Sequence, residues 1–496
     1  MVIASARIGS CARRLLEPVQ WLLFSEGGLM NKQGLLATAL CASLIVLTPT
    51  ATDASCNVLQ FDRFEPVVAE DISRALTEVR SEHGLPAVGA VLVDSNGVIA
   101  YGADGLRLSD GSAEVDLDEL WHLGSNTKAM TATLYATFVR DGELSFDDPL
   151  PSFFPEIAAL PVWQSVTIRH LLRHQGGVVP NLPQMPGSDP ADVMAFRAQW
   201  AEDVLTAEPA SAVGSVSYSN VGIVLVGAAM EAHTGQPWEA LMSQRLFGPL
   251  GMNQCGFGPP PHPGNAQGHG QDGTPLPGAD NTPMLGPAGT VHCSLESWGR
   301  YLSANLAGPK GESPLLGASL WNELHDSASG AAMGWFSSGW YNRPGIWHNG
   351  SNGMWYSQAW IIPGTDRVYG VATNIANGNG ANAAAIRLTE ATSVPLGANE
   401  PYAFGGCSDG NEEQMYCLNL DAESAIDLSI SHEPFGGLLI LEHYNEDGTG
   451  LGQTVGNDSG VSLNTTLPAG RYVFRVVPNN FMPACPPYEV LVTTPP

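Results

Sequence analysis

The chain has 496 residues, of which 44% are hydrophobic and 14% are charged. This composition excludes a disordered protein and suits two or three globular domains with sizeable cores. The formal net charge is -28, which disfavours nucleic acid and anionic membrane surfaces as partners because like charges repel. A charge of this size also keeps a protein in solution.

Residues 1–55 are expected to form a leader that is separate from the folded protein. Met30-Asn-Lys32 precedes an apolar run over residues 34–47, and small residues follow up to Ser55. A positive start, a short apolar core and a small-residue end are typical of a secretory signal peptide. The apolar run is too short to predict a membrane span. We therefore expect a signal peptide that starts at Met30 and a secreted or periplasmic protein without a stable membrane span.

Two of the eight cysteines lie in this leader and six lie beyond it. An even number of cysteines in an exported chain favours disulfides. The pairs that lie near one another in sequence, Cys255–Cys293 and Cys407–Cys417, are the ones we predict. No cysteines have zinc-finger spacing, so the sequence does not predict a structural zinc site.

The region after the leader begins with a predicted helix and a predicted hairpin. Apolar residues recur at helical spacing over residues 67–83, before a Gly-Leu-Pro stop. Residues 88–93 then predict a buried strand, and residues 98–101 predict the antiparallel strand that pairs with it. The turn between them is Asp94-Ser-Asn-Gly97.

A second predicted hairpin lies late in the same region. Its strands cover residues 355–362 and 367–373, and a helix follows over 381–391. Between the hairpins, helical segments alternate with long loops rich in glycine and proline. The helical segments are residues 129–140, 168–173 and 222–233, and the longest loop covers 256–287. This order predicts an α+β domain over residues 62–397, in which helices flank an antiparallel sheet made from both chain ends and form an all-helical insert.

The pattern changes from about Pro401 onwards. Helical periodicity gives way to short alternating runs, separated by clusters of turn residues. This pattern is typical of a small all-β sandwich, which we place at residues 400–496. The runs that predict strands are residues 426–431, 438–443 and 471–476.

The first candidate for chemistry is Ser125-Asn-Thr-Lys128, at the start of a predicted helix. The N-terminus of a helix offers free N–H groups to a developing oxyanion, and a lysine three residues on lies over the same face as the serine. Lys128 is one of only three lysines, in a chain that otherwise uses arginine. A partly buried lysine can lose its proton, whereas arginine cannot, so this choice favours a proton-transferring amine. Taken alone, the motif fits a capping serine and a surface lysine better.

Two further motifs stand at junctions between loops and regular structure. Tyr218-Ser-Asn220 precedes an apolar helix, where a phenol could relay a proton and an amide could bind a substrate amide. His348-Asn-Gly350 precedes Ser351 and a predicted strand. Gly350 would let a substrate approach closely, and the N–H groups of Ser351 and Ser125 could form an oxyanion hole. Each motif alone also fits ordinary packing at a turn.

Taken together, the three motifs resemble those of the penicillin-recognising serine hydrolases, which include class C β-lactamases, D-alanyl-D-alanine carboxypeptidases, D-aminopeptidases and related esterases. The similarity covers roughly residues 65–395 and includes LWHLGSNTKAMTATLYATFVRDGELSFDDPL, VTIRHLLRHQGGV, YSNVGIVLVGAAMEAHTGQPWEALMSQRLFGPLGM and PAGTVHCSLESWGRYL. It implies a β-lactamase-like fold and a serine hydrolase that acts on a small molecule or a peptide. It implies neither a cofactor nor a metal ion.

The resemblance also implies a role for each motif residue. Ser125 is similar to the acylated nucleophile, Lys128 to its proton partner, and Tyr218 to the base that activates water for deacylation. The residues that it implies for substrate binding are Asn220, His348, Asn349, Gly350 and Ser351.

The third motif departs from the β-lactamases of this family. It begins with His348 in place of the usual lysine, as in some carboxypeptidases and D-aminopeptidases, and its middle residue is Asn349 in place of threonine or serine. A protonated histidine would be a switchable cation for a substrate carboxylate, so we expect the rate to fall as the pH rises through the histidine range. We expect an amide or ester substrate, with a peptidase or esterase favoured over a β-lactamase. The alternative is an acylating sensor or a degenerate binding protein of the same family.

Three other patterns are weighed against these motifs. His170 and His174 have metal-ligand spacing on a helix, but no glutamate lies between them, which favours a structural role. Asp147-Asp148 precedes a proline, which favours a turn or a cap over a catalytic pair. The segment 467–475 resembles bacterial pre-peptidase C-terminal domains, which suggests a binding or spacer role for the last domain.

Overall fold

A computed structural model describes residues 69–183, 193–340 and 343–391 and eight shorter segments: 394–395, 402–404, 414–420, 424–432, 439–445, 449–456, 460–478 and 488–493. The predicted leader lies outside these residues. So does Cys407, and the pairing Cys407–Cys417 therefore stays a prediction. Within the described segments, no helix combines the length and the apolar character needed to cross a bilayer.

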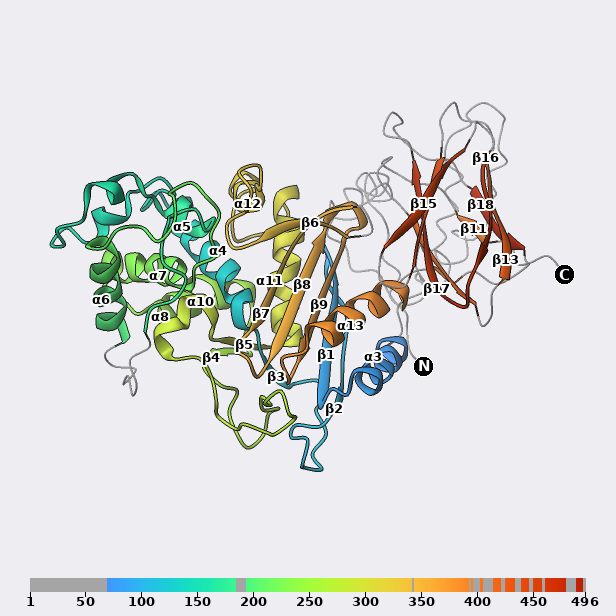
Figure 1. The fold of residues 1–496 in the computed structure, drawn as a ribbon, viewed down its shortest axis with the longest axis horizontal. Helices are drawn as coiled ribbons and strands as arrows, with labels where there is room; N and C mark the ends of the chain where they lie inside the picture. The colour runs from blue at the N-terminus through green and yellow to red at the C-terminus, as the bar shows by residue number, and fades with distance from the viewer. Residues whose placement is uncertain are drawn as a thin grey trace, which may run out of the picture. The chain divides into compact units, whose positions relative to one another are not determined.

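A six-stranded antiparallel sheet is the centre of the larger region (Figure 1). Its strands lie in the order β2-β1-β9-β8-β7-β6. Val91 of β1 pairs with Gly370 of β9, so the early and late hairpins join in one sheet as predicted. The strands are β1 (Ala87–Asp94), β2 (Gly97–Gly105), β6 (Phe336–Trp340), β7 (Arg343–Ser351), β8 (Tyr356–Ile362) and β9 (Arg367–Thr373).

Helices cover both faces of this sheet (Figure 1). The predicted first and last helices, α3 (Ala69–His83) and α13 (Gly378–Ala391), share one face and pack on the same apolar cluster. The other face is covered by α11 (Leu295–Ala307). Gly299 allows that helix to approach β1 closely, because an added Cβ there would lie 3.0 Å from Val91.

The helical insert is larger than the sequence predicts. The three predicted segments correspond to α4 (Thr127–Arg140), α5 (Ile168–Leu172) and α7 (Asn220–Thr234). The pattern missed α6 because Arg197 interrupts its apolar stripe; this side chain is fully buried and bonds Glu231 at 2.6 Å. The further helices are α6 (Val193–Leu205), α8 (Trp238–Met242), α9 (Gly248–Leu250), α10 (Gly286–Gly289) and α12 (Ala318–His325).

A small antiparallel sheet, in the order β3-β5-β4, lies beside the start of α4 and was not predicted. Its strands, β3 (Leu120–His122), β4 (Cys255–Phe257) and β5 (Val291–Ser294), are too short to show a period. Cys255 and Cys293 pair across β4 and β5 and form a disulfide, which confirms this prediction.

The C-terminal strands form two further sheets, with orders β10-β12-β17-β14-β15 and β11-β18-β13-β16. Side chains from both sheets share one apolar core, which fits the predicted sandwich. The three predicted strands correspond to β13, β14 and β17. The strands are β10 (Val394–Pro395), β11 (Tyr402–Phe404), β12 (Gln414–Leu420), β13 (Ser424–His432), β14 (Leu439–Asn445), β15 (Gly450–Val455), β16 (Gly460–Leu467), β17 (Gly470–Pro478) and β18 (Tyr488–Thr493). The α+β architecture with small C-terminal sheets is thus confirmed, whereas the boundaries 62–397 and 400–496 stay predictions.

Candidate active site

Ser125 lies in a short 3-10 turn, Gly124–Asn126, that leads directly into α4. Gly124 has a φ of 49°, which residues with a side chain rarely adopt. An added Cβ at Gly124 would lie 2.6 Å from the backbone nitrogen of Ser351. The backbone of the turn that carries Ser125 is therefore in close contact with the end of β7.

Lys128 is completely buried below this serine. Its Nζ lies 2.8 Å from Ser125 Oγ and donates to the carbonyl oxygen of Ala288 at 2.6 Å. Burial lowers the pKa of Lys128 well below its ordinary value, because the charged ammonium loses its hydration. A neutral amine has a lone pair that can accept the Ser125 proton.

Tyr218 lies over the same lysine, with Lys128 Nζ 4.9 Å from the centre of its ring. Tyr218 is 38% exposed as a whole residue, but burial raises its pKa to about 12, although a hydrogen bond with Ser125 works in the opposite direction. The phenol therefore keeps its proton at neutral pH. In this state it can donate a proton or relay one, and a free phenolate is rare.

His174 supports the tyrosine and does not pair with His170. Its ring lies 4.5 Å from that of Tyr218, and its Nδ1 accepts from the Ser219 N–H at 3.2 Å. His170 Nδ1 instead accepts from the Thr167 N–H at 3.2 Å, as part of the cap of α5. The two histidines with metal-ligand spacing thus serve two separate backbone contacts. Over the described residues, no three side chains of the metal-ligating types converge.

His348 lies within β7 and is buried beside the same group, with its ring 6.3 Å from that of Tyr218. Its Nδ1 hydrogen-bonds the carbonyl oxygen of Asn349. Burial, which is the largest cause, and the charge that Lys128 carries in its ammonium form lower the pKa of His348 to about 3, so the imidazole is neutral at neutral pH. The expectation of a switchable cation at this position is therefore wrong, because the sheet and the aromatic rings exclude the water that would stabilise the charge.

We expect wild type and a His348→Gln variant to show the same pH dependence between about pH 5 and 8. Because the pKa of His348 is about 3, the ring stays neutral throughout this range and its titration cannot change the rate. The measurement is kcat/KM for a neutral ester across the range. A wild-type rate that falls with rising pH, and a variant that loses this fall, would contradict the neutral histidine.

Gly350 and Ser351 place β7 directly against the nucleophile turn. An added Cβ on Gly350 would lie 2.6 Å from the Ser125 nitrogen, so only glycine allows this approach. The backbone of Ser351 makes the reciprocal contact with Gly124. The backbones of the nucleophile turn and of the end of β7 are thus in contact, which would allow the N–H groups of Ser125 and Ser351 to bind one oxyanion.

The two asparagines of the predicted site differ in position. Asn220 begins α7 next to Tyr218, at the expected junction of loop and helix, and its Nδ2 donates to Asn181 Oδ1 at 2.8 Å. Asn349 pairs across the sheet with Gln358, whose amide donates to α13, so the Asn349 side chain lies on the face away from Ser125. Its Nδ2 donates to the Tyr356 hydroxyl at 2.8 Å. The structure thus places Asn220 two residues after Tyr218 at the start of α7, and it turns the Asn349 side chain away from Ser125.

Sequence reasoning missed several groups that hold the site together. Ala288 acts through its carbonyl oxygen, for which no side-chain signal exists. Asn126 lies inside the predicted motif, and its Nδ2 donates to Ser357 Oγ at 2.7 Å. Ser357 Oγ in turn donates to the Leu123 carbonyl at 2.7 Å, which ties β8 to the nucleophile turn. Phe336 on the edge strand packs its ring 5.2 Å from that of His348.

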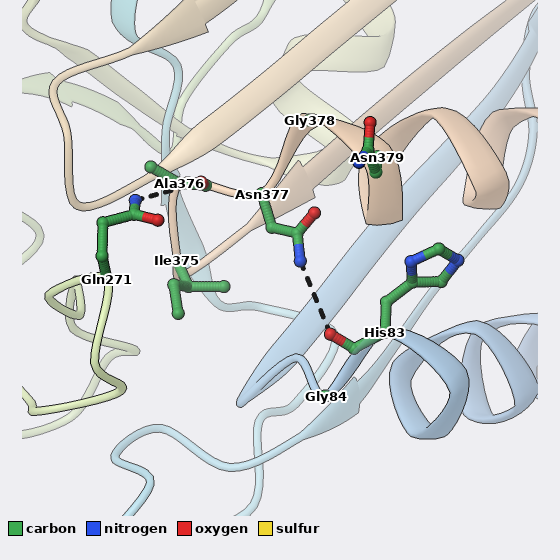
Figure 2. A pocket seen from close by; sticks show the side chains of 8 residues that line it. All are labelled: His83, Gly84, Gln271, Ile375, Ala376, Asn377, Gly378 and Asn379. Atoms are coloured by element: carbon green, nitrogen blue, oxygen red, sulfur yellow. Dashed lines mark hydrogen bonds between the residues drawn. The ribbon is translucent and has the colours of Figure 1, made fainter.

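A separate cavity of about 460 Å³ lies where α3 ends and α13 begins (Figure 2). Its polar groups bond one another: Gln271 Nε2 donates to the Ala376 carbonyl at 3.1 Å, and Asn377 Nδ2 to the His83 carbonyl at 3.5 Å. None of the predicted site residues lines it. We therefore place the candidate active site at Ser125 and not in this cavity. The lining residues are His83, Gly84, Gln271, Ile375, Ala376, Asn377, Gly378 and Asn379.

Comparisons with known proteins agree with this geometry. The sequence model of the family described as Beta-lactamase matches residues 71–393. Penicillin-binding protein 4 of Amycolatopsis lactamdurans is 30% identical over 327 residues, which cover 60% of this chain and 82% of that protein. Esterase EstB of Burkholderia gladioli is 35% identical over 187 residues, which cover 34% of this chain and 47% of that protein.

Solved structures show the same fold. The class C beta lactamase from Rhodobacter sphaeroides superposes with a TM-score of 0.53 at 19% identity, over 64% of this chain and 99% of that chain. The octameric penicillin-binding protein homologue from Pyrococcus abyssi gives a TM-score of 0.54 at 22% identity, over 65% of this chain and 77% of that chain. At these identities the likeness concerns the fold alone.

Proposed function

This chain belongs to the beta-lactamase family of serine hydrolases, and on that premise we propose that it cleaves esters or amides through an acyl-enzyme on Ser125. One observation carries the proposal. Lys128 Nζ lies 2.8 Å from Ser125 Oγ, and burial lowers the pKa of Lys128, which favours the neutral amine beside the hydroxyl. Such an amine can make the serine nucleophilic without a histidine base.

In the proposed acylation, Ser125 Oγ attacks the carbonyl carbon and its proton moves to Lys128 Nζ. The carbonyl oxygen becomes an oxyanion that accepts from the N–H groups of Ser125 and Ser351. When the bond to the leaving group breaks, that group takes a proton from the Tyr218 hydroxyl, which Lys128 replaces. The lysine thus ends the step neutral, and the serine carries the acyl group.

In the proposed deacylation, water attacks the acyl carbon of the ester on Ser125. The proton of this water passes through Tyr218 to Lys128, because the raised pKa of Tyr218 favours a relay over a standing phenolate. The tetrahedral intermediate collapses, the acid leaves, and Lys128 returns the proton to Ser125 Oγ. Neither step requires a metal or a cofactor.

We propose that substrates without an essential carboxylate are preferred, with esters first and amides second. A neutral His348 stands at the start of the third motif, where a cation would bind a carboxylate. Aromatic rings surround it: those of Tyr218 and Phe336 lie 6.3 Å and 5.2 Å from the His348 ring. These aromatic rings favour apolar acyl groups, and the similarity to Esterase EstB supports a preference for esters.

A panel of substrates tests this preference. We expect steady turnover of p-nitrophenyl esters, slower turnover of D- and L-amino acid amides, and the lowest kcat/KM for nitrocefin. The physical reason is the missing cation, which an ester does not need and a β-lactam carboxylate does. Nitrocefin hydrolysis that outpaces every ester would overturn the order.

An acylating sensor is the second candidate, because the raised pKa of Tyr218 would also slow the activation of water. Stopped-flow measurement of p-nitrophenol release distinguishes the two. A sensor gives a burst equal to the enzyme concentration and little release afterwards, whereas an enzyme continues to turn over.

We also propose that the protein is exported, as the predicted signal peptide and the Cys255–Cys293 disulfide favour. The small C-terminal sheets would then be a binding or spacer domain attached to the hydrolase. Fractionation of expressing cells, followed by N-terminal sequencing of the exported form, tests the export. Residence of the whole chain in the cytoplasm would rule it out.

A further inference from the structure

A buried histidine and a buried aspartate lie directly behind the nucleophile turn. His122 Nδ1 accepts from the Gly124 N–H at 3.1 Å, so the proton of the neutral ring is on Nε2. Nε2 lies 2.8 Å from Asp280 Oδ1, although the N–H does not point straight at that oxygen. The two side chains are 0% and 5% exposed. The Asp280 carboxylate thus lies next to the Nε2 proton of His122. Because the ring carries its proton on Nε2, Nδ1 is free to accept from the Gly124 N–H.

Asp280 also holds the other half of the candidate oxyanion hole. Its Oδ1 accepts from Asn352 Nδ2 at 2.9 Å, and Asn352 directly follows Ser351. The Asn352 side chain is itself fixed, because its Oδ1 accepts from the N–H groups of Met354 and Trp355, both at 3.1 Å. One carboxylate oxygen therefore links the serine turn with the end of β7.

The neighbouring residue extends this link to the lysine. Asn281 Nδ2 donates to the Gly289 carbonyl at 2.8 Å, and Gly289 follows Ala288, which accepts from Lys128. An added Cβ on Gly289 would lie 3.7 Å from the carbonyl carbon of Gly124, so this segment also packs on the serine turn. Asp280 and Asn281 thus contact residues next to all three parts of the site, although they come from a long loop.

We propose that His122 and Asp280 are positioning residues for acylation, an inference that rests on the proposed function. Asp280 holds His122 in the tautomer that accepts from Gly124, and through Asn352 it holds Ser351 beside Ser125. Loss of this pair lets the two oxyanion N–H groups move apart while Ser125 and Lys128 keep their own contact. Small displacements of this kind cost rate more than binding, because they misplace groups that act in the transition state.

Labelling of Ser125 by a fluorophosphonate probe, followed by mass spectrometry on the full chain, measures the effect. The serine oxygen forms the bond to phosphorus and fluoride leaves, so the rate reports acylation without turnover. We expect Asp280→Ala to slow labelling by about tenfold or more. With a p-nitrophenyl ester, kcat should fall by a similar factor and KM should stay within about twofold. Asp280→Asn should recover part of the rate, because its amide oxygen can still accept from Asn352 and still lies beside His122 Nε2.

A matched control separates positioning from general damage to the fold. Asn265 Oδ1 accepts from the Leu120 N–H at 3.1 Å, at the other end of β3 from His122. Asn265→Ala removes a contact between the same loop and the same strand but none with the serine turn. We expect its melting temperature to fall as in Asp280→Asn, while its labelling rate stays at the wild-type value.

Each outcome decides one of the two proposals. A wild-type protein that is not labelled on Ser125 refutes the proposed function. If the wild type is labelled, a folded Asp280→Ala with the wild-type rate and kcat overturns the positioning role. If Asp280→Ala does not fold, Asp280→Asn decides: we expect labelling at least about threefold slower, and an unchanged rate refutes the inference.

Discussion

A Ser125→Ala variant is expected to lose at least about 10⁴-fold in kcat for its best ester while it keeps its fold. The Ser125 hydroxyl lies 2.8 Å from Lys128 Nζ, in the turn whose backbone contacts Gly350 and Ser351. Its removal leaves no atom for the acyl group to bond. Steady-state rates and probe labelling, with melting temperature as the check of folding, measure this loss.

A control for this variant must leave the acyl-enzyme chemistry intact. Ser337 on β6 is exposed and lies on the edge strand of the same sheet, so Ser337→Ala should retain the wild-type rate. Wild-type activity in Ser125→Ala would mean that another nucleophile does the work, and the whole mechanism would be abandoned.

A Lys128→Arg variant is expected to lose about 10³-fold or more in the rate of acylation. Arginine keeps the positive charge but cannot give up its proton, so it cannot accept the proton of Ser125. Lys128→Met removes the charge and keeps an apolar chain of similar length. Because burial already disfavours the lysine charge, we expect Lys128→Met to fold and to be as inactive as the arginine variant.

The pH profile of the wild type gives a second measure of the same amine. The pKa of Lys128 is lowered, so kcat/KM should rise with pH while the ammonium loses its proton and then reach a plateau. No falling limb is expected until the Tyr218 hydroxyl ionises near its pKa of about 12. Full activity in Lys128→Arg, with the same rising limb, would show that the amine is not the base.

Much of the fold could be predicted because its central elements are long and periodic. The helices α3 and α13 and the hairpins β1–β2 and β8–β9 lie where the pattern places them. The pattern failed where a tertiary contact replaces apolar character, as with the buried Arg197 of α6, which Glu231 and Glu239 neutralise. It also failed for the three-residue strands β3 and β4, which exist only because β5 pairs with both.

Contacts within the candidate site could be predicted where the residues are near in sequence. Ser125 and Lys128 are three residues apart on one helix start, a spacing that brings them together in any such helix. Their distant partners show no such spacing: Ala288 contributes only a carbonyl, and Asp280 comes from a loop without periodicity. His122 stands two residues before Gly124, but its role depends on a hydrogen bond that the sequence does not show.

The sequence alone determined which groups can react: a serine, a scarce lysine, a tyrosine and a histidine, with glycines where two backbones must touch. The tertiary structure decided the protonation states of these groups and the directions in which the side chains point. Burial lowers the pKa of Lys128 and keeps the His348 ring neutral, and strand alternation turns the Asn349 side chain away from Ser125. A pKa depends on the water and the charges around a group, and these are known only once distant segments have packed together.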